Sequence, residues 1–137
     1  MKKGDIIPTM MKDNNPQGIG NDIIEIERVR QSIDRHGQHF LNRLFSSQEQ
    51  DYCYKFKDPV PHFAARFCGK EAIVKALGTG FGESVTWLDM EILNDVSGKP
   101  VILFSEHAIK HFSDPHVLVT ISHSKEHATA FAIWQQK

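Results

Sequence analysis

The sequence predicts an α+β fold, in which a mainly antiparallel sheet packs against one long helix and several shorter helices. Three observations predict it. A short strand opens the predicted domain, and segments with helical spacing of apolar residues follow it. Alternating apolar segments then dominate the C-terminal half. The last two of these surround a turn at Ser124–His127, a pattern typical of an antiparallel hairpin, so the order of elements favours α+β.

The first elements are a strand and a helix. Gly18–Ile24 alternates in the manner of a strand, and from Glu25 the apolar period becomes helical. Gly37 is typical of the residue that ends such a helix. A second apolar cluster covers residues 40–45.

A capping box predicts the next helix. Ser46 is followed three residues later by Glu49, so each side chain can bond the backbone of the other at a helix start. This helix is predicted to reach Tyr54 or Lys57.

Prolines and glycines delimit the remaining elements. The Asp58–Pro61 stretch breaks the preceding helix, and a long helix is predicted from about His62 to Leu77, ending in the loop Gly78–Gly82. The C-terminal half is then predicted as a strand (Trp87–Leu93), a turn (Asn94–Pro100), a strand (Val101–Phe104), a helix capped by Ser105 (Glu106–Phe112), and the hairpin strands (Val117–Ser122 and Ala128–Trp134).

Length and composition exclude several classes of protein. The 137 residues suit one domain, predicted at 17–137 after a short N-terminal extension at 1–16. Charges nearly balance, with 16 Lys+Arg against 17 Asp+Glu, which argues against a nucleic-acid binder that relies on bulk positive charge. The apolar runs are far too short to span a membrane. Two cysteines without a CxxC pair indicate reduced thiols, so we expect a cytoplasmic protein.

The long helix carries a charge in an unexpected place. Lys70 lies on the same helical stripe as Phe67 and Val74, so its ammonium must either extend to solvent or meet a negative partner. Glu71 and Lys75 are neighbours at i and i+4 on one flank of the same helix.

Two interpretations of this helix stay open at this point. In the first, Lys70 reaches solvent and Glu71–Lys75 is an ordinary surface pair. In the second, cationic side chains bind phosphates and Glu71 holds a divalent ion. Mg²⁺ is usually held by one or two carboxylates plus substrate phosphates, and Asp22, at the end of the first strand, is the best second carboxylate.

Several motifs in order resemble one family. Gly18–Ile23 (GIGNDI) and Arg66–Ala72 (RFCGKEA), the latter followed by Lys75–Ala76 and Gly78–Gly80, are similar to the two signature motifs of the holo-acyl-carrier-protein synthases, the short bacterial 4′-phosphopantetheinyl transferases. Phe45–Glu49, Asp89–Ile92, Gly98–Pro100 and Val119–His123 resemble further segments of that family in the same order. The resemblance covers nearly the whole domain.

The resemblance implies an activity. It implies transfer of 4′-phosphopantetheine from coenzyme A to a serine of acyl carrier protein, releasing 3′,5′-ADP, as a step of fatty acid biosynthesis. Asp22 and Glu71 would match the family's Mg²⁺-binding carboxylates, and Lys75 the residue near the reacting phosphate. Such charges suit a reaction in which negative charge grows on pyrophosphate oxygens. The base stays open between Glu71, a metal-bound water and another carboxylate. A single unit of this length also implies a homotrimer with sites between subunits.

The resemblance also implies a coenzyme A-binding set. Its members are Arg66, Lys70, Gly78, Gly80, Gly98, Lys99, Pro100, Ser122 and His123. Each has a simpler alternative: a salt bridge for Arg66, a subunit contact for Lys70, a structural histidine for His123, and turns for the glycines.

The predicted first helix has a face suited to an acidic partner. Arg28 and Arg35 share it with Gln31 and Ser32, opposite the apolar stripe. This face predicts docking of the carrier protein, and the alternative is an ordinary solvated face.

Two competing functions belong to other classes. The first is a coenzyme A- or nucleotide-binding module of the same fold without catalysis, and the second is a structural trimer whose charged helix only stabilises the interface.

The chain departs from the usual family pattern at Cys68–Gly69, where small alanines are common. A glycine inside a helix costs about 1 kcal/mol relative to alanine.

Overall fold

A computed structural model describes residues 16–135, and these form one three-stranded sheet, one strand pair and a set of helices. The elements are β1 (Pro16–Glu25), α2 (Ile26–Leu44), α3 (Ser47–Cys53), α4 (Val60–Leu77), the 3₁₀ turn η1 (Trp87–Asp89), β2 (Met90–Asn94), β3 (Pro100–Phe104), α5 (Glu106–His111), β4 (His116–His123) and β5 (His127–Gln135). The predicted extension lies outside the described residues, except for Pro16, which begins β1.

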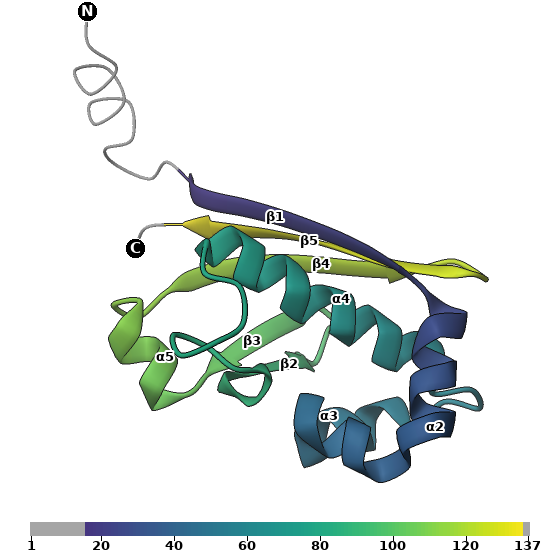
Figure 1. The fold of residues 1–137 in the computed structure, drawn as a ribbon. Helices are drawn as coiled ribbons and strands as arrows, with labels where there is room; N and C mark the ends of the chain where they lie inside the picture. The colour runs from purple at the N-terminus through teal and green to yellow at the C-terminus, as the bar shows by residue number, and fades with distance from the viewer. Residues whose placement is uncertain (1–15, 136–137) are drawn as a thin grey trace, which may run out of the picture.

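The predicted α+β class is confirmed, and every paired strand is antiparallel. The large sheet has the order β1-β5-β4, and β2 pairs with β3. α4 crosses one face of the large sheet, and α2 and α3 lie near its N-terminal end (Figure 1). The strand that opens the chain is therefore a neighbour of the last strand, with Asp22 opposite Ala130 in the register.

Two glycines explain how closely β1 approaches α4. A Cβ on Gly18 would collide with the backbone oxygen of Ala76, and a Cβ on Gly20 would collide with that of Ala72. Because neither residue has a side chain, the strand lies directly on the helix backbone. This close packing sets the position of Asp22 two residues further along.

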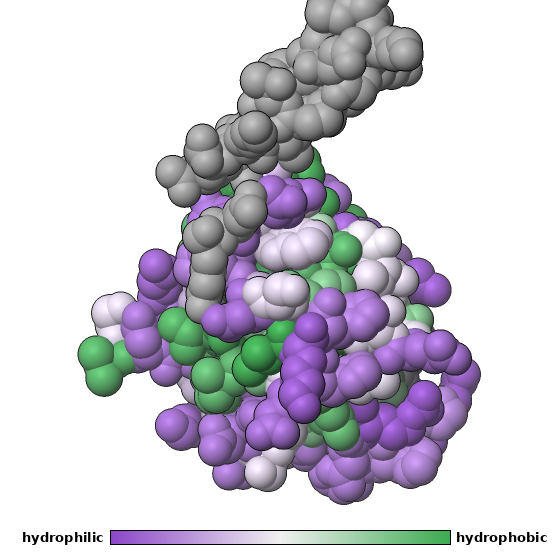
Figure 2. Space-filling view, turned by 90° about the vertical axis from the view of Figure 1, so that its left-hand side faces the viewer, coloured by the Kyte–Doolittle hydropathy of each residue, from purple (hydrophilic) through white to green (hydrophobic). Residues whose placement is uncertain are grey.

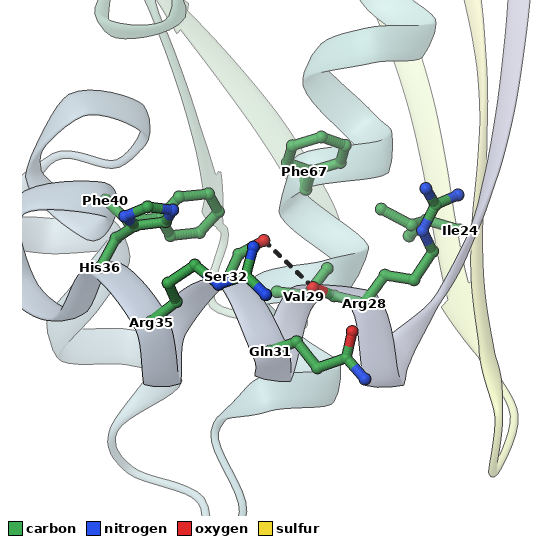
Figure 3. A pocket seen from close by; sticks show the side chains of 9 residues that line it. All are labelled: Ile24, Arg28, Val29, Gln31, Ser32, Arg35, His36, Phe40 and Phe67. Atoms are coloured by element: carbon green, nitrogen blue, oxygen red, sulfur yellow. Dashed lines mark hydrogen bonds between the residues drawn. The ribbon is translucent and has the colours of Figure 1, made fainter.

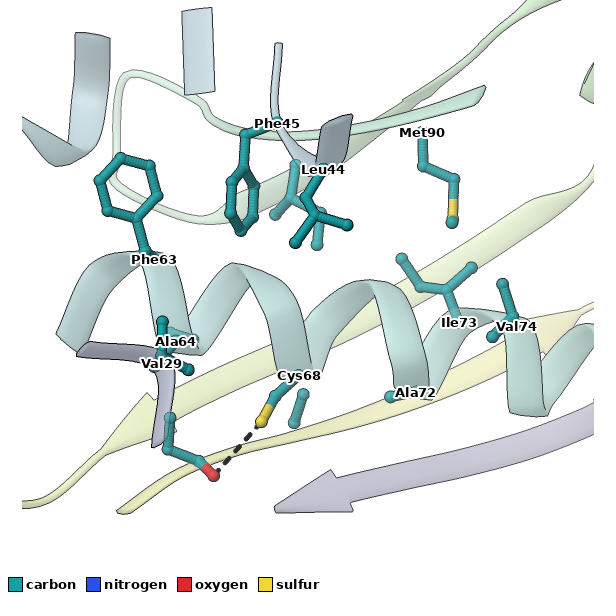
Figure 4. Packing of buried hydrophobic residues seen from close by; sticks show 14 of the residues in the cluster. Val29, Leu44, Phe45, Phe63, Ala64, Cys68, Ala72, Ile73, Val74 and Met90 are labelled. Atoms are coloured by element: carbon teal, nitrogen blue, oxygen red, sulfur yellow. Dashed lines mark hydrogen bonds between the residues drawn. The ribbon is translucent and has the colours of Figure 1, made fainter. Parts of the chain in front are cut away.

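α4 is the centre of the core, and most of its circumference is buried. Phe63, Ile73 and Val74 are fully enclosed, and Phe63 packs on Phe45 with ring centroids 5.1 Å apart (Figure 4). The helix has neighbours on almost all sides because it lies between the large sheet, α2, α3 and β2. Gly69 leaves room for Ile92 and Ile121, and the helix runs through it without a break.

Several predicted boundaries differ from the structure. Trp87–Asp89 is a 3₁₀ turn rather than the start of a strand, because Thr86 and Asp89 form a capping box. The helical segment of α2 resumes beyond Gly37 and continues to Leu44, with Gly37 at φ 59° forming a kink between two helical parts. α4 begins at Val60, because a proline is tolerated in the first turn of a helix.

The surface near α5 is mixed in character. Figure 2 shows hydrophobic residues gathered in the middle of this face, with hydrophilic residues around them. Among the described residues, no helix is both long and apolar enough to cross a bilayer.

Candidate active site

β1 and α4 bring together Asp22, Glu71 and Lys75, the three residues predicted to be catalytic. The Lys75 ammonium donates to the backbone oxygen of Asn21 at 2.8 Å and to Asp22 Oδ1 at 3.2 Å. The Lys75 side chain is half exposed, whereas the Asp22 side chain is only 19% exposed. Among the described residues, the ion-pair partner of Lys75 is therefore Asp22 and not Glu71, so the surface pair considered above is not formed.

Glu71 lies beside this pair in a partly desolvated position. Its burial raises the pKa of its carboxyl group, and the negative charge of Asp22 raises it further, while Lys75 opposes both effects. A carboxylate whose pKa is raised by a neighbouring carboxylate gains from a cation that both can share. The site thus has an electrostatic demand for positive charge that Lys75 meets only in part.

A buried thiol lies behind the two carboxylates. Cys68 donates to the backbone oxygen of Ala128 at 3.4 Å (Figure 4). Burial and the charge of Asp22 raise the pKa of the Cys68 thiol to about 12. The thiol therefore stays neutral and adds no third negative ligand.

The chemistry of this donor set fits a hard divalent ion with few protein ligands. Asp22 and Glu71 supply oxygen atoms, and within residues 16–135 no group of three His, Cys, Asp or Glu side chains forms a potential metal site. An all-protein cage is thus absent from the described part of the chain. Mg²⁺ is commonly held by one or two carboxylates, with water and substrate phosphates completing its shell.

Lys70 is not available to a phosphate, which corrects the assignment to coenzyme A binding. Its side chain is fully buried, and its ammonium donates to Glu49 Oε1 at 2.8 Å. The other two bonds go to the backbone oxygens of Leu44 at 2.6 Å and Trp87 at 3.0 Å. An ammonium has three protons, so none is left. Of the two alternatives for Lys70, solvent or a negative partner, the structure has the second, and the partner is Glu49.

Arg66 is likewise buried, with 2% of its surface exposed. Its guanidinium donates to the backbone oxygen of Ile92 at 3.1 Å and to the side chain of Asn94. Asn94 in turn donates to the backbone oxygen of Gly98 at 2.9 Å. Direct phosphate binding by Arg66 does not fit this burial. Its observed contacts instead stabilise the turn that carries Gly98, Lys99 and Pro100.

The two predicted glycine loops lie apart from each other. Gly78, at φ 81°, ends α4, and Gly80 follows in the adjoining loop. Gly98, at φ 90°, is in the turn between β2 and β3. These positive φ values explain the glycines as turn residues, as the simpler alternative predicted.

Ser122 and His123 end β4 near the opposite end of α4. Side chains alternate along a strand, so these two point to opposite faces of the sheet. His123 faces the helix side, where its ring lies 5.1 Å from that of His62. About 16 residues of helix, or roughly 24 Å, separate His62 from Gly78. Within one chain, the predicted coenzyme A residues are therefore not gathered around a single point.

The predicted docking face borders a cavity of about 510 Å³. Arg28, Arg35, Gln31 and Ser32 come from one side of α2, and Phe67 points toward the cavity from α4 (Figure 3). The two arginines are exposed, so the cavity has an apolar floor and a cationic rim.

Sequence reasoning missed the roles of three residues. The capping box identified Glu49, and its carboxylate also accepts from Lys70 and from the Ile92 N–H, which nothing local predicts. Asn94 was assigned only to a turn. The sequence predicts His62 only as the start of a helix, and no spacing pattern links it to His123.

Comparison with known proteins shows which family this chain belongs to. The model of the 4′-phosphopantetheinyl transferase superfamily matches residues 18–132, so the chain belongs to this superfamily.

Named relatives and solved structures are similar over most of the chain. The holo-[acyl-carrier-protein] synthase of Protochlamydia amoebophila is 55% identical over 117 residues, which are 85% of this chain and 96% of that protein. A crystal structure of the Bacillus anthracis synthase with CoA (3′,5′-ADP) has a TM-score of 0.77 at 35% identity and covers 89% of this chain and 98% of its own. The Helicobacter pylori synthase in complex with coenzyme A has a TM-score of 0.77 at 32% identity, covering 85% and 98%.

Proposed function

We propose that this chain is a holo-acyl-carrier-protein synthase, which transfers 4′-phosphopantetheine from coenzyme A to a serine of apo acyl carrier protein. The observation that carries this proposal is the meeting of Asp22 of β1 with Glu71 and Lys75 of α4, about 50 residues further along the sequence. The names of the relatives, and the coenzyme A complexes of two solved neighbours, support the choice of substrates.

In this reaction the serine oxygen forms a bond to the β-phosphorus of coenzyme A, and the bond from that phosphorus to the bridging pyrophosphate oxygen breaks. The products are the phosphoserine diester on the carrier and 3′,5′-ADP. We propose that Lys75, whose ammonium is half exposed beside Asp22, donates to a phosphate oxygen as negative charge develops there. The serine proton passes to Glu71, to a metal-bound water or to another carboxylate.

We propose that Asp22 and Glu71 hold Mg²⁺. When bound, this ion would neutralise charge on the pyrophosphate oxygens. The support is the donor chemistry of the pair and the unmet demand for positive charge between the two carboxylates. Asp22 keeps its position through the close packing of β1 on α4 and through the bond from Lys75.

We propose that the enzyme is a homotrimer whose sites lie between subunits. The separation of the glycine loop after α4 from His123 supports this, because a second subunit could bring the missing elements together. The outward face of the β1-β5-β4 sheet supports it as well, since Ile19 and Ile23 are 62% and 67% exposed and Leu118 and Phe131 about 40%. Contiguous exposed apolar residues are typical of association surfaces.

The remaining coenzyme A assignments stay part of the proposal. They are Gly78, Gly80, Gly98, Lys99, Pro100, Ser122 and His123, with Arg66 acting through the Gly98 turn. We also propose that Arg28 and Arg35 dock the carrier protein, supported by their exposed position around the cavity on α2. We also propose that the enzyme is cytoplasmic, that it serves fatty acid biosynthesis, and that residues 17–137 form one domain.

Mass spectrometry of the carrier tests this function. Apo acyl carrier protein, coenzyme A and Mg²⁺ are incubated with the full chain, and the carrier is expected to gain the mass of one phosphopantetheine. Removal of the metal with EDTA should abolish the gain, and added Mg²⁺ should restore it. Coenzyme A binding without any mass gain would instead identify a non-catalytic binding module.

A further inference from the structure

Two histidines face each other at the N-terminal end of α4, outside the group formed by Asp22, Glu71 and Lys75. His62 lies in the first turn of α4, and His123 ends β4. Their rings are 5.1 Å apart and nearly perpendicular, at 78°. Phe56 also contacts His62 as a stacked ring, with centroids 3.5 Å apart. The two imidazoles are therefore held in a defined arrangement.

The ring nitrogens of both histidines are unused. Within residues 16–135, neither imidazole donates or accepts a hydrogen bond. His123 is exposed and His62 is half-buried, so a ligand from solvent can reach the pair. Up to four ring nitrogens are thus available, and protonated imidazoles use both of theirs as donors.

The charges around His62 favour an anion over a metal ion. Arg66 lies one turn further along α4, and its positive charge acts on His62 together with that of His123. Asp58 in the preceding loop is the acid whose charge acts on His62, and it is bound to Arg30 of α2 at 2.8 Å. α3 contributes only Tyr52, whose ring edge is 6.4 Å away. A cation would gain no negative ligand here, whereas an anion would meet two imidazoles beside a guanidinium.

We propose that His62 joins His123 in binding a phosphate group of coenzyme A, so that the two imidazoles form one proton-linked phosphate site. The inference rests on the proposed function and adds His62 to its substrate-binding residues. Each histidine donates a ring N–H to phosphate oxygens, and the bound anion removes the repulsion between the two protonated rings. Binding therefore takes up protons, and affinity rises as the pH falls toward the ordinary range of histidine.

The free protein has the electrostatics that this linkage needs. Burial lowers the pKa of His62, and the charges of His123 and Arg66 lower it further, while Asp58 opposes them. His62 is consequently mostly neutral near pH 7 before the ligand binds. A phosphate bound between the rings raises the pKa of His62, because its negative charge stabilises the protonated imidazole.

NMR titration of the full-length protein tests the proposal, with 3′,5′-ADP as the probe. The ring signals are assigned with the variants His62→Phe and His123→Gln, and the pKa of each histidine is measured with and without the probe. We expect the pKa of both to rise on binding. The exposed His39 of α2 is the internal control, and its pKa should not change.

A second measurement uses His62→Phe, which keeps an aromatic ring on Phe56. Loss of a charge-assisted hydrogen bond should weaken 3′,5′-ADP binding about tenfold at pH 6, and less at pH 8. The KM for coenzyme A should rise with that for the carrier unchanged, and His39→Phe should match the wild type. Binding of the probe with no change in the pKa of His62, or equal affinity of the variant at both pH values, would overturn the proposal. Failure of the wild type to bind the probe or modify the carrier would overturn the proposed function with it.

Discussion

Two lysines five residues apart on α4 form ion pairs of opposite character. Lys70 pairs with Glu49 at 2.8 Å, and both side chains are fully buried. Lys75 pairs with Asp22 at 3.2 Å, and the two side chains are 51% and 19% exposed. The same helix therefore carries one pair inside the protein and another that solvent and ligands can reach.

The partners show what each pair does. Around Lys70, every donor and acceptor is matched by another part of the fold: Leu44 at the end of α2, Glu49 of α3 and Trp87 of η1. Around Lys75, the neighbouring Glu71 retains a raised pKa. A satisfied buried pair can only hold elements together. An accessible cluster with two carboxylates and one ammonium can bind a ligand and take part in its reaction.

The largest expected effect comes from breaking the buried pair. Lys70→Met leaves the Glu49 carboxylate buried without its cation, which should destabilise the fold by about 3–5 kcal/mol. Adding Glu49→Gln should recover part of the loss, because the uncompensated charge disappears. Urea unfolding measures both. The matched control, Lys75→Met, should stay within about 0.5 kcal/mol of the wild type, and equal losses for the two lysines would refute the distinction between the pairs.

A second change alters the accessible pair through the backbone. Gly20→Ala places a Cβ against the Ala72 backbone oxygen, so β1 must move away from α4. We expect a loss of about 1–3 kcal/mol together with reduced transfer, since Asp22 moves with the strand. Gly82→Ala is the control, because a Cβ there meets no atom within 4 Å. A Gly20→Ala enzyme with unchanged stability and rate would show that the close packing does not position Asp22.

The docking face offers a smaller, partner-specific effect. Reversing the charge of Arg28 and Arg35 should raise the KM for the acidic carrier about tenfold or more and leave that for coenzyme A nearly unchanged. Arg43→Glu is the control, since this exposed arginine of α2 lies outside the cavity lining. Steady-state kinetics with each substrate varied in turn measures both constants. An unaltered carrier KM would assign Arg28 and Arg35 to an ordinary solvated face.

The smallest effect is a pH dependence of stability in metal-free buffer. The pKa of Glu71 is raised in the folded state, so its ionised form is less favourable there than in the unfolded chain. The ionisation of Glu71 therefore lowers the free energy of unfolding as the pH rises from the ordinary glutamate pKa through the folded-state pKa. Glu71→Gln lacks this loss, and its Tm relative to the wild type should increase slightly across that interval. A difference that falls with rising pH would contradict the assigned direction.

Local patterns predicted most of the fold because its elements carry local signals. The Ser46–Glu49 capping box is present as predicted, with Glu49 accepting from the Ser46 N–H at 2.9 Å. The prediction of a strand at Trp87 is wrong because the Thr86–Asp89 capping box bends the chain into a 3₁₀ turn there. The sequence predicts that Lys70 either extends to solvent or meets a negative partner, and only the tertiary structure selects the second alternative and identifies Glu49.

The candidate site was predictable only in part. Asp22, Glu71 and Lys75 were chosen by motif and spacing, and the fold brings them together through the glycines of β1. The buried state of Arg66 could not be inferred, because helical periodicity describes one helix face and α4 has neighbours on nearly all of them. The pairing of His62 with His123 depends on the meeting of a helix start with a strand end, which no local pattern encodes.

The most direct test is transfer by the Glu71→Gln variant. It keeps the size of the side chain and removes one of the two acids that are proposed to share a cation. Our account predicts that phosphopantetheine transfer to the carrier falls at least about 100-fold, with folding and oligomeric state unchanged. A variant that modifies the carrier at the wild-type rate would show that the Asp22–Glu71 pair is not the reacting centre.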